Sequence, residues 1–250
     1  MNSFSEEFSI TAPPGDGISC IKFEKSSNYS NLLLVSSWDS TTRLYDTLNN
    51  CTKATFNFKA ACLACCFNPS LNNIGFAGGL DKSIKLLDLN RGIDTLVGTH
   101  KEAVSCIEYN NATNLLFSGG WDCCINGWDI RDVRENKISM LIDAKIYSFF
   151  THSNLVVLAT SKNNVIIYDI RNSSSPVFSH TYKYQIRKVA SFPNCLGYVV
   201  TSIEGRVFVE HFEQNENLKN FAFKCHRKGD NAYPVNAIAF NPNYGTNLKR

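Results

Sequence analysis

The sequence SGGWDCCINGWD, which runs from Ser118 to Asp129, places an Asp in a predicted turn and a Trp-Asp pair six residues later. Similar segments run from Ser36 to Asp46 and from Ala77 to Asp88, and weaker copies end at Tyr168-Asp169 and Glu210-His211. The closing positions 46, 88, 129, 169 and 211 are 42, 41, 40 and 42 residues apart. A register this constant indicates an internal repeat.

Each repeat has the pattern of short β-strands. In the third unit, apolar and polar residues alternate over 104–109, 115–117 and 125–130, with Asn, Gly, Ser and Asp between these runs. No amphipathic helix is expected. A period of about 41 residues, four short strands per unit and a closing Trp-Asp are typical of WD-repeat β-propellers, in which each blade is a four-stranded sheet. The predicted fold is therefore an all-β WD-repeat β-propeller of the seven-bladed family.

The repeats are expected to form a single propeller domain over residues 1–250. The predicted units cover about 11–53, 54–95, 96–136, 137–178 and 179–226, with a partial sixth at 227–250. Seven blades need roughly 290 residues, so we expect about five blades, plus the first strand of a sixth over Val235–Phe240. A further strand, predicted over residues 4–10, would pair into the last blade of a closed ring.

Two interpretations of this length stay open. The chain is either a C-terminally truncated form of a longer protein, which the stop inside a repeat favours, or an open fragment. Unpaired strand edges would make an open fragment prone to aggregate.

Composition places the chain among folded proteins. It has 250 residues, 44% hydrophobic and 19% charged, and its apolar runs are too short to span a membrane. A net charge of +3 does not predict a nucleic-acid groove, although it allows a local basic patch. We therefore expect neither direct nucleic-acid binding nor a membrane partner.

The ten cysteines are expected to stay reduced, because Met1–Glu7 has neither the basic nor the apolar region of a signal peptide. Cys62 and Cys65 form a C-x-x-C pair, but residues three apart on a strand point to opposite faces. We therefore expect no metal site and no cofactor there. Cys20, Cys65 and Cys106 hold matching places in three repeats and are predicted to be small buried filler.

Four residues of the third unit have the spacing of the hydrogen-bonded tetrad of WD repeats: His100, Ser118, Asp122 and Trp128. The turn Asp accepts from imidazole and backbone N–H, while the hydroxyl and the indole N–H complete the chain. A hydrolase triad is the alternative for Ser, His and Asp. The Asp position recurs at 39 and 81 without a histidine, and no G-x-S-x-G elbow is present, so the structural tetrad is favoured.

Beyond the repeat, specific segments resemble the Bub-type mitotic checkpoint WD-repeat family over roughly residues 8–241. These segments are PPGDGIS (13–19), LLVSSWD (33–39), GGLD (78–81), DLN (88–90), LVGTH (96–100), YQIR (184–187), SIEGRV (202–207), FAFKCHR (221–227) and YPVNAI (233–238). The Rae-type mRNA-export propellers are a related family and the alternative assignment. A propeller hydrolase is the alternative from another class.

The resemblance implies a non-enzymatic adaptor of the spindle assembly checkpoint, located in the nucleus, at kinetochores and also in the cytoplasm. Its implied partners are a checkpoint kinase of the Bub family or its paralogue, a phosphothreonine repeat of the kinetochore scaffold, and the mitotic checkpoint complex. By motif, Arg187 would meet acidic residues of the kinase. Arg206 and Lys224 would hold the phosphothreonine, and Trp38 and Trp121 would pack against bound peptide.

The residue types agree with these roles but also have simpler interpretations. Arg offers a planar fork to carboxylate or phosphate, and Lys adds a point charge. Basic residues in short turns are otherwise solvated, and each Trp otherwise covers its own turn. Seven basic residues of the last third of the chain predict a local basic face: Lys183, Arg187, Lys188, Arg206, Lys224, Arg227 and Lys228.

Overall fold

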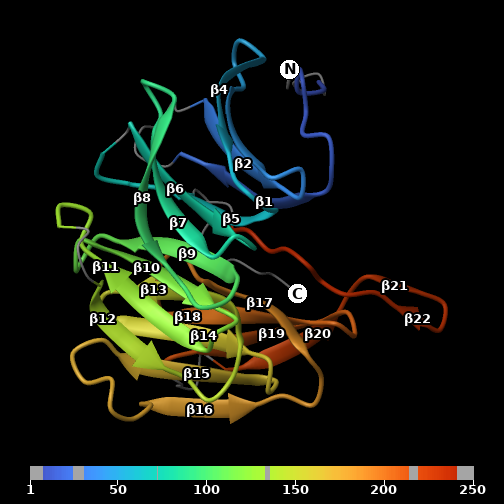
Figure 1. Cartoon of the computed structure of the whole chain (residues 1–250). Coiled ribbons are helices and arrows are strands. Elements are labelled where there is room, and N and C mark those ends of the chain that lie inside the picture. The colour runs from blue at the N-terminus through green and yellow to red at the C-terminus, as the bar shows by residue number, and fades with distance from the viewer. Residues whose placement is uncertain (1–7, 25–30, 72, 133–135, 214–218, 241–250) are drawn as a thin grey trace. The chain divides into compact units, whose positions relative to one another are not determined.

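Strands are the regular elements of the described chain, as the alternating pattern predicts. The computed structural model describes residues 8–24, 31–71, 73–132, 136–213 and 219–240. They form two compact units, residues 1–99 and 100–250 (Figure 1). In the described residues, no helix is long and apolar enough to cross a membrane.

Residues 1–99 contain two antiparallel four-stranded sheets, each with its strands in chain order. Sheet 1 consists of β1 (Ile18–Phe23), β2 (Leu32–Ser37), β3 (Thr41–Asp46) and β4 (Cys51–Asn57). Sheet 2 consists of β5 (Cys62–Phe67), β6 (Ile74–Gly79), β7 (Ser83–Asp88) and β8 (Ile93–Thr99). One apolar core joins the sheets, with Leu34 and Phe56 from sheet 1 against Cys65 and Leu87 from sheet 2.

Residues 100–250 contain three sheets of the same kind and a short hairpin. Sheet 3 consists of β9 (Val104–Asn110), β10 (Leu115–Gly120), β11 (Cys124–Trp128) and β12 (Asn136–Leu141). Sheet 4 consists of β13 (Ile146–His152), β14 (Leu155–Thr160), β15 (Asn164–Asp169) and β16 (Phe178–Thr181). Sheet 5 consists of β17 (Ile186–Ser191), β18 (Gly197–Ser202), β19 (Arg206–His211) and β20 (Phe221–Lys224), and the hairpin of β21 (Arg227–Lys228) and β22 (Asn231–Ala232).

Apolar clusters lie between successive sheets of this unit. Phe117 and Ile125 of sheet 3 pack with Phe149 of sheet 4, and Val157 of sheet 4 packs with Val200 of sheet 5. Successive four-stranded meanders packed face to face are the construction of a β-propeller, and the fold class is the one predicted. The predicted unit boundaries at 53, 95, 136 and 178 fall within the fourth strands of sheets 1 to 4, so each sheet extends a few residues past them.

All five sheets share two local backbone features, a β-bulge and a turn residue with positive φ. The second residue of each first strand is a β-bulge: Ser19, Leu63, Ser105, Tyr147 and Arg187. The turn between the second and third strands contains a residue with positive φ, between 61° and 69°: Ser40, Lys82, Cys123, Asn163 and Gly205. Bulges and left-handed turn residues direct side chains away from a regular ladder. The same end of every sheet therefore presents a turn of the same shape.

The predicted Asp positions stabilise this turn in sheets 1, 2 and 3. Each carboxylate accepts a backbone N–H from the loop before the first strand, and a second N–H from two residues further along its own turn. The donors are Gly15 and Thr41 for Asp39, Lys59 and Ser83 for Asp81, and Lys101 and Cys124 for Asp122, at 2.8–3.2 Å.

In sheet 3 a chain of side-chain hydrogen bonds extends from this turn into the core. His100 Nδ1 lies 3.0 Å from both carboxylate oxygens of Asp122, and His100 Nε2 lies 2.8 Å from Ser118 Oγ. Trp128 Nε1 donates to the same Ser118 Oγ at 2.8 Å. Ser118 is fully buried, so a substrate carbonyl has no access to its hydroxyl. The geometry thus favours a structural chain over a hydrolase triad.

Two predicted strands are not seen in the described residues. Val235–Phe240 was predicted as a strand, but the backbone there is irregular, because no described strand lies beside it to complete a ladder. Val235 is instead fixed by Thr201, whose hydroxyl donates to the Val235 carbonyl at 2.9 Å, and its side chain is buried against Phe192 and Val199. Of the strand predicted over 4–10, residues 4–7 lie outside the described residues, and 8–10 are not in a strand.

The cysteines agree with the filler prediction where they are buried. Cys65 and Cys106 are buried and Cys20 is half-buried, and none of the ten cysteines, all of which are described, forms a disulfide. Burial raises the pKa of Cys62 to about 12 and that of Cys106 to about 11, which keeps both thiols protonated and unreactive. Among the described residues, no cluster of three or more His, Cys, Asp or Glu side chains has the arrangement of a metal site.

The tetrad generates a stability prediction. Ser118→Ala removes the hydroxyl that is hydrogen-bonded to Trp128 Nε1 and His100 Nε2. A buried polar group left without a hydrogen bond lowers the free energy of unfolding by about 1–3 kcal/mol. We expect the urea midpoint of Ser118→Ala to fall accordingly. Ser139→Ala, at an exposed position of β12, is the matched control and should unfold like the wild type. Equal midpoints for the two variants would contradict the structural role.

Asp122 generates a prediction of pH dependence. Burial acts to raise the pKa of Asp122, but the hydrogen bonds from the Lys101 and Cys124 N–H groups and the interaction with His100 outweigh it and hold the pKa below 3.8. Such a carboxylate stabilises the fold above its unfolded-state pKa, and this contribution is lost as the pH falls through the folded-state value. Below about pH 4, wild-type stability should therefore fall more steeply than that of Asp122→Asn. Parallel acid-unfolding curves would contradict this.

Candidate functional site

Three of the predicted binding residues lie at one end of sheet 5. In an antiparallel meander, the start of the first strand, the start of the third and the end of the fourth meet at the same end of the sheet. Arg187 is the second residue of β17, Arg206 is the first of β19, and Lys224 is the last of β20. We call these three residues, with the neighbouring Lys183 and Arg227, the basic end of sheet 5.

Arg206 and Lys224, the two predicted phosphothreonine ligands, stand directly opposite each other on β19 and β20. Residues paired in this way have Cβ atoms about 4.5–5.5 Å apart, so both side chains can reach one small anion. Lys224 is exposed on the edge strand. Arg206 is partly exposed, and its Nε lies 2.9 Å from Glu204 Oε1. Glu204 therefore neutralises part of the charge of Arg206 in the free protein.

Gly205 allows the turn to approach the end of β20. Its φ is +67°, and a Cβ placed on it would lie 2.4 Å from the carbonyl oxygen of Cys225. Any other residue would push these two segments apart. The Cys225 N–H donates to the Gly205 carbonyl at 2.8 Å, which fixes the turn beside Lys224. Gly205 thus lets the turn before Arg206 lie close to the residue that follows Lys224.

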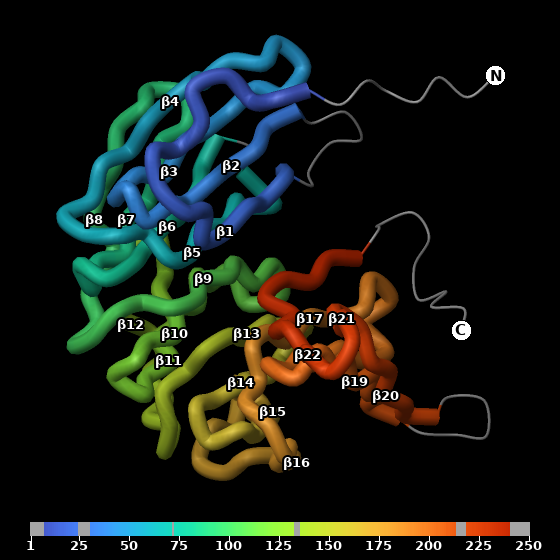
Figure 2. Tube along the Cα trace, turned by 90° about the vertical axis from the view of Figure 1, so that its right-hand side faces the viewer, coloured from blue at the N-terminus to red at the C-terminus, as the bar shows by residue number. Residues whose placement is uncertain are grey.

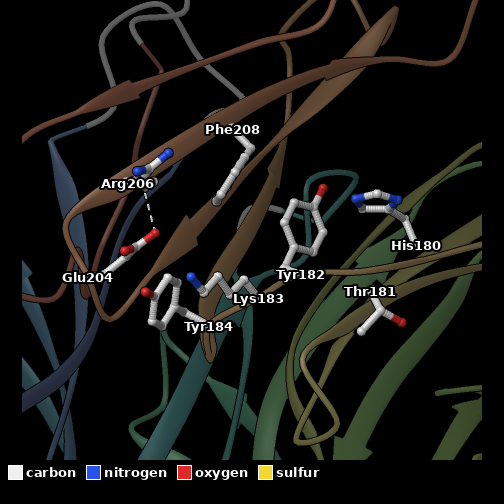
Figure 3. Close-up of a pocket in the computed structure, with 8 residues that line it drawn as sticks. All are labelled: His180, Thr181, Tyr182, Lys183, Tyr184, Glu204, Arg206 and Phe208. Carbon is white, nitrogen blue, oxygen red and sulfur yellow. Dashed lines mark ion pairs between the residues drawn. The ribbon is translucent and has the colours of Figure 1, made fainter.

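A cavity of about 260 Å³ opens beside Arg206 (Figure 3). Figure 3 shows Arg206 and Glu204 on one side of it and Lys183 and Tyr184 nearby. Glu204 is the one acid among the eight described residues that line it, which are His180, Thr181, Tyr182, Lys183, Tyr184, Glu204, Arg206 and Phe208. Two cations and three aromatic rings make this cavity suitable for a peptide that carries an anionic group.

Behind the cavity wall, Glu210 fills the position that Trp128 occupies in sheet 3. Burial raises its pKa, against the effect of the Tyr182 hydroxyl at 3.3 Å. Tyr182 is itself buried and lies edge-on to Phe208 with ring centroids 4.7 Å apart. The departure from the repeat at Glu210 therefore shapes the packing of two residues that line the cavity.

Arg187 is held by the segment that follows the hairpin. It is exposed at the β17 bulge, and its Nε donates to Asn236 Oδ1 at 3.0 Å. Arg227 of the β21–β22 hairpin donates from Nη2 to the Glu204 carbonyl at 2.8 Å, so the hairpin reaches the same turn (Figure 2). Two of the seven basic residues that were predicted to share a face lie outside the basic end. Lys188, next to Arg187 on β17, is half-buried, and Lys228 is exposed on the hairpin.

The two predicted aromatic contacts occupy equivalent turns in different sheets. Trp38 precedes Asp39 in sheet 1, and 50% of its surface is exposed. Trp121 precedes Asp122 in sheet 3, is half-buried, and has Lys145 Nζ 5.9 Å from its ring centroid. The fold places Arg206 and Lys224 directly beside each other. Each Trp lies in the turn of its own sheet, and Trp38 belongs to the unit of residues 1–99.

Sequence reasoning missed three residues of this site: Glu204, Tyr184 and Asn236. Glu204 had a detectable signal, because it fills the Asp position of the fifth repeat two residues before Arg206. Tyr184 lies in the YQIR segment next to Lys183, whose Nζ is 5.2 Å from the Tyr184 ring centroid. Asn236 had no such signal, since its contact with Arg187 depends on how the segment after β22 returns to sheet 5.

Comparison with known proteins connects this geometry to a family. The family model described as "WD domain, G-beta repeat" matches residues 5–46 and 93–129. The chain is 41% identical over 249 residues to mitotic checkpoint protein BUB3.1 of Arabidopsis thaliana, covering 95% of this chain and 72% of the relative. It is 38% identical over 252 residues to mitotic checkpoint protein bub3 of Dictyostelium discoideum, covering 97% and 75%.

A poly(A)+ RNA export protein of Schizosaccharomyces pombe is also similar, at 29% identity over 255 residues, covering 96% of this chain and 70% of the relative. The checkpoint proteins are thus more similar than this export protein over the same span. Together with the repeated sheets and turns, these similarities show that the chain belongs to the BUB3 family of mitotic checkpoint WD40-repeat proteins.

Proposed function

We propose that this protein is a non-enzymatic adaptor of the spindle assembly checkpoint, and that Arg206 and Lys224, at the basic end of sheet 5, bind a phosphothreonine-bearing peptide. The observation that carries the proposal is the cross-strand pair of Arg206 and Lys224 beside a cavity with a second lysine, Lys183. The names of the similar BUB3 proteins support the checkpoint role.

The charge balance at the basic end favours a dianion over a carboxylate. Arg206 already has one carboxylate partner, Glu204, at 2.9 Å. Lys224 and Lys183 are exposed and add two further positive charges around the same turn. A phosphothreonine carries about −1.5 to −2 charges at pH 7 and three acceptor oxygens, so it satisfies several cations at once, whereas a carboxylate satisfies fewer.

The remaining predicted residues would bind a second ligand. Arg187 is exposed at the same end of sheet 5 and would meet acidic residues of a Bub-family checkpoint kinase or its paralogue. Trp38 and Trp121 would pack against that peptide, since exposed aromatic residues commonly anchor interfaces. The phosphothreonine repeat would belong to the kinetochore scaffold. The adaptor would thereby join the mitotic checkpoint complex in the nucleus, at kinetochores and in the cytoplasm.

The phosphate site is tested by titrating a fluorescent phosphothreonine peptide of the kinetochore scaffold and its unphosphorylated twin. A hydrogen bond to a charged group contributes about 1.5–3 kcal/mol, so Arg206→Ala and Lys224→Ala should each weaken phosphopeptide binding about tenfold or more. Arg171→Ala is the matched control, because Arg171 is an exposed arginine in the turn after β15 that pairs with Asp169. It should bind as the wild type does.

Equal affinity of the wild type for the two peptides would contradict the phosphate site. So would unchanged affinity in Arg206→Ala when its urea midpoint matches that of the wild type.

The second ligand is tested separately with Arg187→Glu. A charge reversal at an exposed residue that faces acidic partners replaces attraction with repulsion. We expect a recombinant fragment of the checkpoint kinase to lose binding to Arg187→Glu, while the phosphothreonine peptide keeps most of its affinity. Arg91→Glu, at an exposed position of the turn between β7 and β8, should retain binding of the kinase fragment. Retention of the fragment by Arg187→Glu would remove Arg187 from the kinase site.

A further inference from the structure

The segment 9–17, which we call the strap, lies across sheet 1 and is fixed at several points. The Thr11 N–H donates to Asn50 Oδ1 at 2.9 Å, and the Tyr45 hydroxyl donates to the Ala12 carbonyl at 2.9 Å. At the other end, the Gly15 N–H donates to Asp39 Oδ2 at 2.9 Å. The strap therefore connects the end of β3 to the turn that contains Trp38 and Asp39.

Arg43 occupies the centre of this arrangement and binds both parts. Its Nη1 donates to the carbonyls of Ala12 and Pro13 at 3.0 and 2.8 Å. Its Nη2 donates to Asp39 Oδ2 at 2.9 Å, and its Nε donates to Thr41 Oγ1 at 3.1 Å. Only 19% of the side chain is exposed. A planar fork with five donors can hold two carbonyls, a carboxylate and a hydroxyl together, whereas an ammonium group cannot match this geometry.

The repeat makes the role of Arg43 specific to sheet 1. In sheet 3 the turn carboxylate of Asp122 is bound by His100, and sheet 1 has no histidine in that register. In sheet 1, Arg43, four residues after Asp39, binds the turn carboxylate instead. Lys85 holds the same position in sheet 2, but its Nζ pairs with Asp94 at 2.8 Å and donates to the Asn57 carbonyl at 2.9 Å.

Trp38 lies at the junction of the strap and this turn. Its backbone N–H donates to the Gly17 carbonyl at 2.9 Å, at the end of the strap. A Cβ placed on Gly17 would lie 3.6 Å from Trp38 Cδ1, so the indole ring lies against the strap while half of it stays exposed. An exposed ring that is already ordered loses less entropy when a partner covers it.

We propose that Arg43 is a positioning residue for Trp38. Its guanidinium fixes the strap to the turn carboxylate of Asp39, and the strap and the turn together hold the exposed indole in one orientation for peptide contact. The contribution of this orientation to binding rests on the proposed function, in which Trp38 packs against the kinase peptide.

The orientation of Trp38 is measured by fluorine NMR of protein labelled with 5-fluorotryptophan. The chain has three tryptophans, and Trp38→Phe and Trp121→Phe assign the resonances. In Arg43→Gln the Trp38 resonance should shift and broaden, while those of Trp121 and Trp128 stay unchanged and report that residues 100–250 remain folded. Arg43→Lys, which keeps the charge but not the fork, should restore the Trp38 resonance only in part. Arg91→Gln, the matched exposed arginine, should leave all three resonances in place.

Binding of the checkpoint kinase fragment provides the second readout. Loss of one pre-ordered side chain is worth about three- to tenfold in affinity, and we expect this loss in Arg43→Gln. If Arg43 acts through Trp38, Arg43→Gln should weaken binding no further in the Trp38→Ala background, because coupled residues are not additive.

An unmoved Trp38 resonance in Arg43→Gln overturns the proposal, and so does an additive loss of affinity in the double variant. If the wild type does not bind the kinase fragment, the proposed function fails, and the fluorine spectrum still decides whether Arg43 positions Trp38.

Discussion

The carboxylate in the turn between the second and third strands is the interaction on which sheets 1, 2 and 3 of this protein depend. Asp39, Asp81 and Asp122 each join the loop before the first strand to the turn at the far end of the second strand. An unpaired carboxylate in a half-buried turn would be unfavourable, so each one accepts backbone N–H donors and, in sheets 1 and 3, also contacts the side chain of Arg43 or His100. The turn is thereby fixed in one shape, and whatever side chain it carries is presented at the same end of the sheet.

Sheet 5 uses the same turn for a different purpose. Glu204 replaces Asp, and its carboxylate interacts with Arg206 rather than acting as the main support of the turn. Gly205 provides the left-handed residue and permits close approach of Cys225. Structural support is then supplied from outside the repeat, by the hairpin residue Arg227 and by the buried Val235. Because the Glu204 carboxylate is not the main support of this turn, we propose that the turn and the basic residues near it bind a ligand.

Much of the fold follows from the sequence because the repeat is local. The Asp spacing predicts the turns, and the third repeat predicts which residues form the hydrogen-bonded chain of His100, Ser118 and Trp128. The predicted strand at Val235–Phe240 is wrong because a strand depends on a neighbour as well as on its own alternation. The family resemblance predicts that Arg206 and Lys224 hold one phosphothreonine, but it does not predict their cross-strand pairing, because the register of β19 with β20 depends on the loop between them. The contacts of Arg43 with the Ala12 and Pro13 carbonyls had no sequence signal, because backbone carbonyls are present at every residue.

In the proposed complex, a phosphothreonine lies between Arg206 and Lys224 at the basic end of sheet 5. The most direct test is a phosphorus NMR titration of the phosphothreonine peptide, free and saturated with protein, across the second ionisation of the phosphate near pH 6. Nearby cations stabilise the dianion, so its pKa should fall on binding to the wild type and return toward the free value in the Arg206→Ala/Lys224→Ala variant at saturating protein. An unchanged phosphate pKa in the saturated wild-type complex would contradict the account.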